Sequence, residues 1–220
     1  MTLKTDPKRF NLIAKLAFAP IYPYLAERIK EKFGITTGVC IDAGSGPGSL
    51  AIAMARITNL TIFSLDIQPK MSEIARQNVS EAGLSRCIIA TTANVSKMPF
   101  KDDSVDLIIS RGSIFFWDDR VAAFREIYRV LKPGGVAYCG GSMGNAEVKS
   151  QVMESFSTNQ VLKGEKEAWE EVAQISHKLS PERLQNELRQ ASVAGTVEQE
   201  NGGLWVQILK HRVGSESVFS

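Results

Sequence analysis

The sequence predicts an α/β fold in which helices cover both faces of a doubly wound sheet of about seven strands. Short apolar runs alternate with helical segments along most of the chain, which is typical of a mostly parallel sheet. The first run, at 39–43, ends in a glycine-rich turn that leads into a helical stretch. Near the C-terminus, Asn201-Gly202-Gly203 between two possible strands predicts a hairpin.

The elements can be assigned in order. Residues 6–33 favour helix in two pieces, broken by Pro20 and Pro23. The predicted elements that follow are strand 39–43, helix 48–57, strand 60–66, helix 69–82, strands 86–92 and 105–110, helix 118–131 and strand 135–140. No helix is expected between the third and fourth strands.

The C-terminal third begins with a polar, helix-rich insertion at 145–178. Ser180 then provides an N-cap and Pro181 a first-turn residue for another helix. Two last strands are expected at 196–200 and 204–209. We interpret 1–220 as a single domain, and its predicted parts are a helical lid at 1–34, a core at 35–142, a helical insertion at 143–192 and final strands at 193–212.

The glycine turn has the spacing G-x-G-x-G at Gly44, Gly46 and Gly48, with Asp42 two residues before it. Glycines let a ligand lie against the backbone, although the same pattern also makes a plain tight turn. A dinucleotide fingerprint would read G-x-G-x-x-G. A carboxylate would repel a pyrophosphate but suit a cationic ligand such as S-adenosylmethionine.

Further motifs follow in a regular order. The second predicted strand ends in Asp66, whose two oxygens can accept both hydroxyls of a ribose. The segments Met98-Pro99-Phe100 and Asp106-Leu107-Ile108 come next. A helix end, a turn and a new strand are indicated by Arg129-Val130-Leu131-Lys132-Pro133-Gly134-Gly135.

Together these motifs resemble the class I S-adenosylmethionine-dependent methyltransferases, over about 35–142. The most similar branch is the small-molecule group that includes the ubiquinone/menaquinone methyltransferases. The resemblance implies a Rossmann-like sheet with an antiparallel strand near its end, S-adenosyl-L-methionine as cofactor and S-adenosyl-L-homocysteine as product. The residues that it assigns to the cofactor are Tyr22, Asp42, Gly44, Ser45, Gly46, Gly48, Asp66, Ile67, Asn94, Val95, Ser110 and Arg111.

Within this set the resemblance gives several residues a role. Asp42 would face the methionyl ammonium, Asp66 the ribose, and Ile67 the adenine. Asn94 stands where many relatives carry an acid, and its amide oxygen can still accept a hydrogen bond from the adenine amine. Tyr22 or Tyr24 in the lid would touch the methionine carboxylate, unless both simply pack against the sheet.

The segment Ser110 to Trp117 follows the fourth strand, where this fold points residues at the sulfonium and the acceptor. It lacks the motif of enzymes that methylate amino groups of bases. Arg111 and Ser113 are the candidate catalytic residues. Arg111 can grip an anionic group of the acceptor or of the methionyl end, or form a structural salt bridge with Asp118 or Asp119. The aromatic residues of the segment, Phe115, Phe116 and Trp117, would line an acceptor pocket or pack as core.

Composition excludes several classes. A formal charge of +2 without a basic stripe gives no case for nucleic acid. No apolar run reaches the ~18 residues of a membrane span, and the first ten residues lack a signal-peptide core. Three cysteines beside predicted strands are read as buried reduced thiols. No metal site is expected. His177 is read as solvated or capping. We expect a cytoplasmic monomer or homodimer. Its acceptor is expected to be a small molecule, which is anionic in one interpretation.

The predicted function is methyl transfer from S-adenosylmethionine by in-line displacement. Two alternatives stay open. A silent S-adenosylmethionine-binding protein would share the same turn. A nicotinamide-dependent reductase would share the general architecture, although the glycine spacing and Asp42 speak against it.

Overall fold

We describe a computed structural model of the chain. It describes residues 6–167, 169–170 and 179–211, and His177 lies outside them. Its helices are α1 (Pro7–Leu16), α2 (Ile21–Phe33), α3 (Ser49–Ala55), α4 (Pro69–Glu81), α5 (Arg120–Val130), α6 (Ala146–Thr158) and α8 (Pro181–Ala191), with short 3-10 turns η1 (Ile114–Phe116) and η2 (Gln160–Leu162).

One seven-stranded sheet carries the fold, in the order β3-β2-β1-β4-β5-β7-β6. Its strands are β1 (Thr37–Ala43), β2 (Asn59–Asp66), β3 (Ile88–Thr92), β4 (Val105–Arg111), β5 (Leu131–Gly141), β6 (Gly195–Glu200) and β7 (Gly203–Leu209). β7 pairs antiparallel with both β5 and β6, and the other pairings are parallel. The predicted Rossmann-like sheet is confirmed. The strand order reverses direction between β1 and β4, where ligands bind in folds of this kind.

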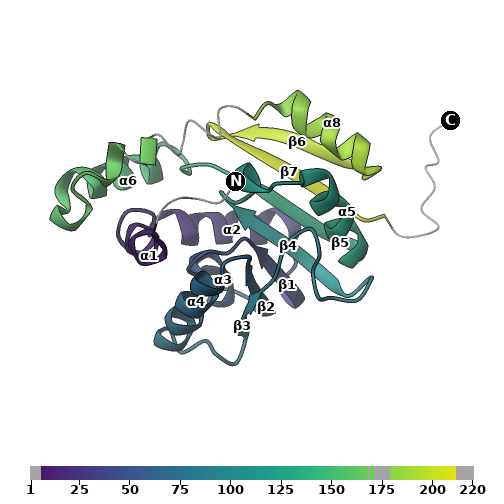
Figure 1. Cartoon of the computed structure of the whole chain (residues 1–220), viewed down its shortest axis with the longest axis horizontal. Helices are drawn as coiled ribbons and strands as arrows, with labels where there is room; N and C mark the ends of the chain where they lie inside the picture. The colour runs from purple at the N-terminus through teal and green to yellow at the C-terminus, as the bar shows by residue number, and fades with distance from the viewer. Residues whose placement is uncertain (1–5, 168, 171–178, 212–220) are drawn as a thin grey trace.

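Alternate strand residues face two separate cores. Cys40 and Leu107 point toward α1, α2, α3 and α6, whereas Ile41 and Ile108 point toward α5 and α8. Figure 1 shows α6 at one end of the molecule beside α1, and α8 over β6 and β7 at the opposite side of the sheet. Fully buried β-branched residues on both faces explain why these strands read as continuous apolar runs.

Helix boundaries follow capping chemistry at several points. The Asp6 carboxylate accepts the Arg9 N–H at 3.0 Å, and the Ser180 hydroxyl accepts the Arg183 N–H at 3.2 Å. Pro20 separates α1 from α2 as predicted. The prediction that Pro23 also breaks the helix was wrong, because Pro23 lies in the first turn of α2, where a backbone N–H would have no helical partner.

Two connections shape the carboxyl edge of the sheet. No helix joins β3 to β4, as the sequence predicted, and the link at 93–104 is a loop held against α5. At the other end Asn201 and Gly202 both have positive φ, 49° and 67°, and turn β6 into β7. Within the described part of the chain, no helix is both long and apolar enough to cross a bilayer.

Candidate functional site

A cavity of about 540 Å³ lies along the carboxyl ends of the parallel strands. Its floor comes from the tips of β1, β2, β4 and β5, and its walls from α1, η1, the start of α5, α6 and the β6–β7 turn. Its lining includes Phe10, Gly44, Asp66, Ile67, Asn94, Val95, Arg111, Ser113, Phe115, Phe116, Trp117, Ser142, Met143, Lys149, Trp169, Asn201 and Gly202. Segments from both ends of the chain therefore meet around one space.

Ser113 sits directly on the glycine turn. Its hydroxyl donates to the Ala43 carbonyl at 2.8 Å and accepts the Trp117 indole N–H at 3.1 Å. The Ser110 hydroxyl lies 2.6 Å away, and it must be the donor of that pair because the Ser113 hydrogen is already used. The hydroxyl of Ser113 thus has no hydrogen left for a substrate, and the geometry suits a structural tie between β4 and β1.

Asp66 ends β2 with its carboxylate beside the turn. One oxygen accepts the Gly46 N–H and the other the Gln68 N–H, both at 2.9 Å. Burial raises the pKa of this carboxyl, and the two N–H groups oppose the shift. Each oxygen keeps a free lone pair, so the carboxylate can organise the turn and still face the cavity. The next residue, Ile67, is 52% exposed there, as an apolar platform would be.

Asp42 takes a different place. It is buried, and its Oδ2 accepts the Ala51 N–H at 3.1 Å near the start of α3. Burial raises its pKa to about 7, while the Ala51 N–H lowers it and the nearby Asp66 raises it. Asp42 does not line the cavity, so a direct contact with an ammonium stays a prediction, and its observed partner is the helix backbone.

Arg111 ends β4 and lines the cavity. Its guanidinium carbon lies 4.7 Å from the Phe18 ring centre and 5.9 Å from that of Tyr22. The Tyr22 hydroxyl forms hydrogen bonds with Ser49 and Arg111. Burial raises the pKa of Tyr22, with the charge of Arg111 opposing, and burial lowers the pKa of Arg111. Tyr22 itself lies behind Arg111 and does not line the cavity.

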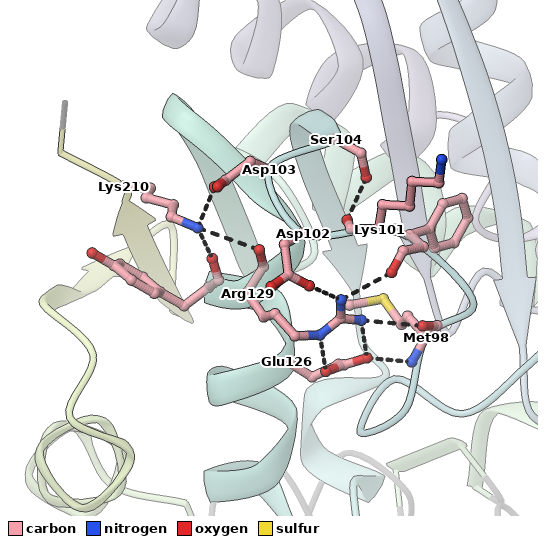
Figure 2. Close-up of polar contacts among 10 residues, drawn as sticks. Met98, Lys101, Asp102, Asp103, Ser104, Glu126, Arg129 and Lys210 are labelled. Atoms are coloured by element: carbon pink, nitrogen blue, oxygen red, sulfur yellow. Dashed lines mark hydrogen bonds and ion pairs between the residues drawn. The ribbon is translucent and has the colours of Figure 1, made fainter. Parts of the chain in front are cut away.

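The loop at 93–104 forms the cavity wall beside Asp66, and α5 fixes it. Glu126 accepts the Met98 N–H at 2.6 Å, and Arg129 forms two hydrogen bonds with Glu126 at 2.8 and 2.7 Å. The same guanidinium donates to the Phe100 carbonyl at 2.9 Å and to Asp102 at 2.5 Å. Figure 2 shows these contacts converging on Arg129. We refer to Arg129 and Glu126 as the loop clamp.

Comparison with known proteins identifies the family. Residues 41–139 match a methyltransferase domain. A putative S-adenosyl-L-methionine-dependent methyltransferase of known structure from Methanococcus maripaludis is 38% identical, with a TM-score of 0.84 and coverage of 100% of both chains. The chain belongs to the class I S-adenosylmethionine-dependent methyltransferases. This confirms the resemblance that the motifs predicted.

Curated relatives of this chain match over shorter stretches. A ubiquinone/menaquinone biosynthesis C-methyltransferase from Marinomonas sp. is 29% identical over 153 residues, which is 68% of this chain and 61% of the relative. An uncharacterized protein from Mycobacterium bovis is 32% identical over 127 residues, 57% of this chain and 44% of that protein. The chain thus spans less than half the length of the first curated relatives it matches.

The cavity of this chain fits the cofactor of its family. Gly44 brings bare backbone to the cavity wall, Asp66 offers paired acceptors, and Arg111 Nε is buried without a hydrogen-bond partner among the described residues. The predicted cofactor and catalytic residues that line the cavity are Gly44, Asp66, Ile67, Asn94, Val95, Arg111 and Ser113, and the predicted aromatic residues Phe115, Phe116 and Trp117 line it too. Those that do not are Tyr22, Asp42, Ser45, Gly46, Gly48 and Ser110, which build the turn and its supports.

The sequence did not predict some of the residues that line the cavity. The most prominent are Phe10, Met143, Lys149 and Trp169. The ring centres of Phe10 and Trp169 lie 6.0 Å apart, and the Phe10 ring covers Gly46 at the glycine turn. The spacing of Phe10, Ile13 and Ala14 on α1, continued by Ala17 at its C-cap, is a usable signal for an inward face, whereas nothing in the local sequence marks Trp169.

Proposed function

We propose that this protein transfers a methyl group from S-adenosylmethionine to a small-molecule acceptor by in-line displacement. The observation that carries the proposal is the single cavity that joins an acid-tipped strand β2 to an aromatic wall across the β1–β4 switch point. The similarity to the Marinomonas quinone C-methyltransferase supports a small acceptor.

The cofactor half lies over β1 and β2. Asp66 would accept the ribose hydroxyls, Ile67 would pack on the adenine, and Gly44 would leave room beside the turn. Asn94 would accept from the adenine amine, although its Oδ1 already accepts the Ser96 N–H at 2.9 Å. When bound, the cofactor supplies a methyl group that its sulfonium has already activated, so these residues need only bind and orient.

The acceptor half lies over β4 and β5. Rings of Phe10, Phe115 and Trp169 would exclude water from it. Ser113 is committed to its hydrogen bonds with Ala43, Ser110 and Trp117 and is a poor general base. The residues therefore favour an acceptor that is nucleophilic without a strong base at the site.

Calorimetry with S-adenosylhomocysteine tests cofactor binding, and conversion of S-adenosylmethionine to S-adenosylhomocysteine with a panel of aromatic and apolar acceptors tests transfer. Binding without turnover across the panel favours the silent alternative. Stabilisation by a nicotinamide dinucleotide instead of S-adenosylhomocysteine in a thermal-shift comparison contradicts the proposal. We also propose that 1–220 acts as one domain, as a cytoplasmic monomer or homodimer, which light scattering and fractionation can test.

A further inference from the structure

We propose that Arg111 forms a subsite for an anionic group of the methyl acceptor. The inference rests on the proposed function and goes further, because it names the chemical class of the acceptor. Three observations support it: Arg111 has no acidic partner among the described residues, it ends β4 on the other side of the switch point from Asp66, and aromatic rings line the same cavity.

The first observation concerns pairing. Among the residues that the structure describes, Arg111 has two polar partners, the Tyr22 hydroxyl and, at 3.4 Å, the Ser142 carbonyl. Its Nε is buried and unpartnered. By contrast, Arg120 on the neighbouring helix forms two hydrogen bonds with Glu187 at 2.6 and 2.8 Å. Burial of a cation without a counter-charge is costly, so a ligand that supplies one would be bound strongly.

The second observation concerns position. Sheet order places β4 and β5 on the far side of β1 from β2, so Arg111 and Asp66 come from opposite sides of the switch point. Lys149, on the helix after β5, lines the cavity as a second cation. The methionyl end of the cofactor carries two positive charges, on its ammonium and its sulfonium, against one carboxylate, so its net charge is positive. An anion on the acceptor would offset part of this positive charge.

The third observation concerns the walls. The planar guanidinium of Arg111 is suited to two-point hydrogen bonding with a carboxylate or a phosphonate. Phe115 and Trp169 line the same cavity and can pack on a flat apolar body. The acceptor class is therefore an aromatic or apolar acid, bound with its anionic group on Arg111.

The test uses small probes and the full chain saturated with S-adenosylhomocysteine. Benzoate and phenylphosphonate carry the anion, and benzamide is the neutral counterpart of benzoate. Ligand-observed NMR titration should show that the wild type binds both anions at least tenfold more tightly than benzamide. Arg111→Gln should abolish this preference, and Arg111→Lys should retain a part of it. Lys163→Gln, which removes an exposed charge outside the cavity wall, should leave the preference unchanged.

A second titration distinguishes the cofactor from the acceptor. 5′-Methylthioadenosine lacks the amino-acid end of S-adenosylhomocysteine. If Arg111→Gln lowers the affinity for S-adenosylhomocysteine tenfold or more and leaves the affinity for methylthioadenosine unchanged, Arg111 holds the methionyl carboxylate and the inference is overturned. Equal and small changes in the affinities for the two ligands support the inference.

The remaining outcomes are also decisive. If wild type saturated with S-adenosylhomocysteine binds benzamide as well as the anions, the inference fails and the proposed function stands. If the wild type does not bind S-adenosylhomocysteine, the proposed function fails and the inference with it. Should Arg111→Gln not fold, the wild-type preference and Arg111→Lys still decide.

Discussion

A Cβ atom placed on Gly44 would lie 2.4 Å from both Cβ and Oγ of Ser113, so the loop after β4 rests on the turn after β1. Gly44 also has a φ of +68°, a conformation that other residues rarely adopt. Two separate effects therefore exclude a side chain at this position, and they can be separated by experiment.

Gly44→Ala should lower the free energy of unfolding by roughly 2–5 kcal/mol, since left-handed strain and a steric clash add. Gly34 is the matched control, because its φ is +66° and a Cβ there meets nothing within 4 Å. Gly34→Ala should lower the free energy of unfolding only by the backbone strain, roughly 1–2 kcal/mol. Urea unfolding measures both, and equal losses would show that Ser113 is not the obstacle. Adding Ser113→Gly to Gly44→Ala should recover part of the difference.

Asp66→Ala should weaken the binding of S-adenosylhomocysteine by about 1–3 kcal/mol in calorimetry, which is the usual loss for hydrogen bonds to a charged group. Asp106→Ala is the control, because Asp106 also accepts a backbone N–H, that of Val39 at 2.8 Å, but lies outside the cavity wall. The control should lower stability and leave the affinity unchanged. An unaltered affinity in Asp66→Ala would remove this carboxylate from the ribose site.

Asp42 should make stability depend on pH. Its folded pKa is raised to about 7 from an ordinary 3.8, so the folded state binds the extra proton between these values. Stability is then lost as pH rises toward 7 and is level above it. Relative to Asp42→Asn, the wild type should lose roughly 2–3 kcal/mol between pH 5 and 7. Urea unfolding of both proteins at pH 5, 6, 7 and 8 measures the difference, and parallel curves would refute it.

Arg129→Lys should loosen the loop clamp, because an ammonium cannot reach Glu126, Asp102 and the Phe100 carbonyl together. We expect about 1–3 kcal/mol less stability and a several-fold weaker affinity for 5′-methylthioadenosine. Arg125→Lys is the control, since exposed Arg125 makes one bond, to the Gln190 carbonyl at 2.7 Å. An affinity that does not respond to Arg129→Lys would mean that the loop holds its shape without the clamp.

Arg111→Met should leave the ligand-free protein as stable as the wild type or more stable. An apolar side chain of similar length avoids the desolvation of an unpaired guanidinium and can still pack on Phe18. Thermal unfolding without ligand measures this. A large loss of stability would instead mean that the contacts with Tyr22 and Ser142 are net stabilising.

The order and type of the strands could be predicted because each is a local apolar run bounded by turns. Boundaries were less secure: β5 begins at Leu131, before the predicted turn at Pro133-Gly134, because this stretch continues to pair with β4. Pro23 was misread because its effect depends on where α2 begins. Such positions are decided by neighbours that the local sequence does not contain.

Some residues of the candidate site could likewise be predicted from the local sequence, and others could not. Residues at strand tips, such as Asp66 and Arg111, could be placed at the cavity because the sheet edge itself locates them. Asp42 could not, since its direction depends on the docking of α3. Phe10, Lys149 and Trp169 reach the cavity from distant helices, and only the folded chain brings them there.

The cavity wall begins at Phe10 and ends at Gly202, almost the full described length of the chain. During synthesis, the glycine turn and Asp66 would emerge long before the β6–β7 turn that closes the far wall. A growing chain thus holds the first contacts for a ligand well before it can enclose one. Ligand retention would then mark the moment at which the last hairpin docks, so slow release of ligand reports a finished fold and not merely a formed turn.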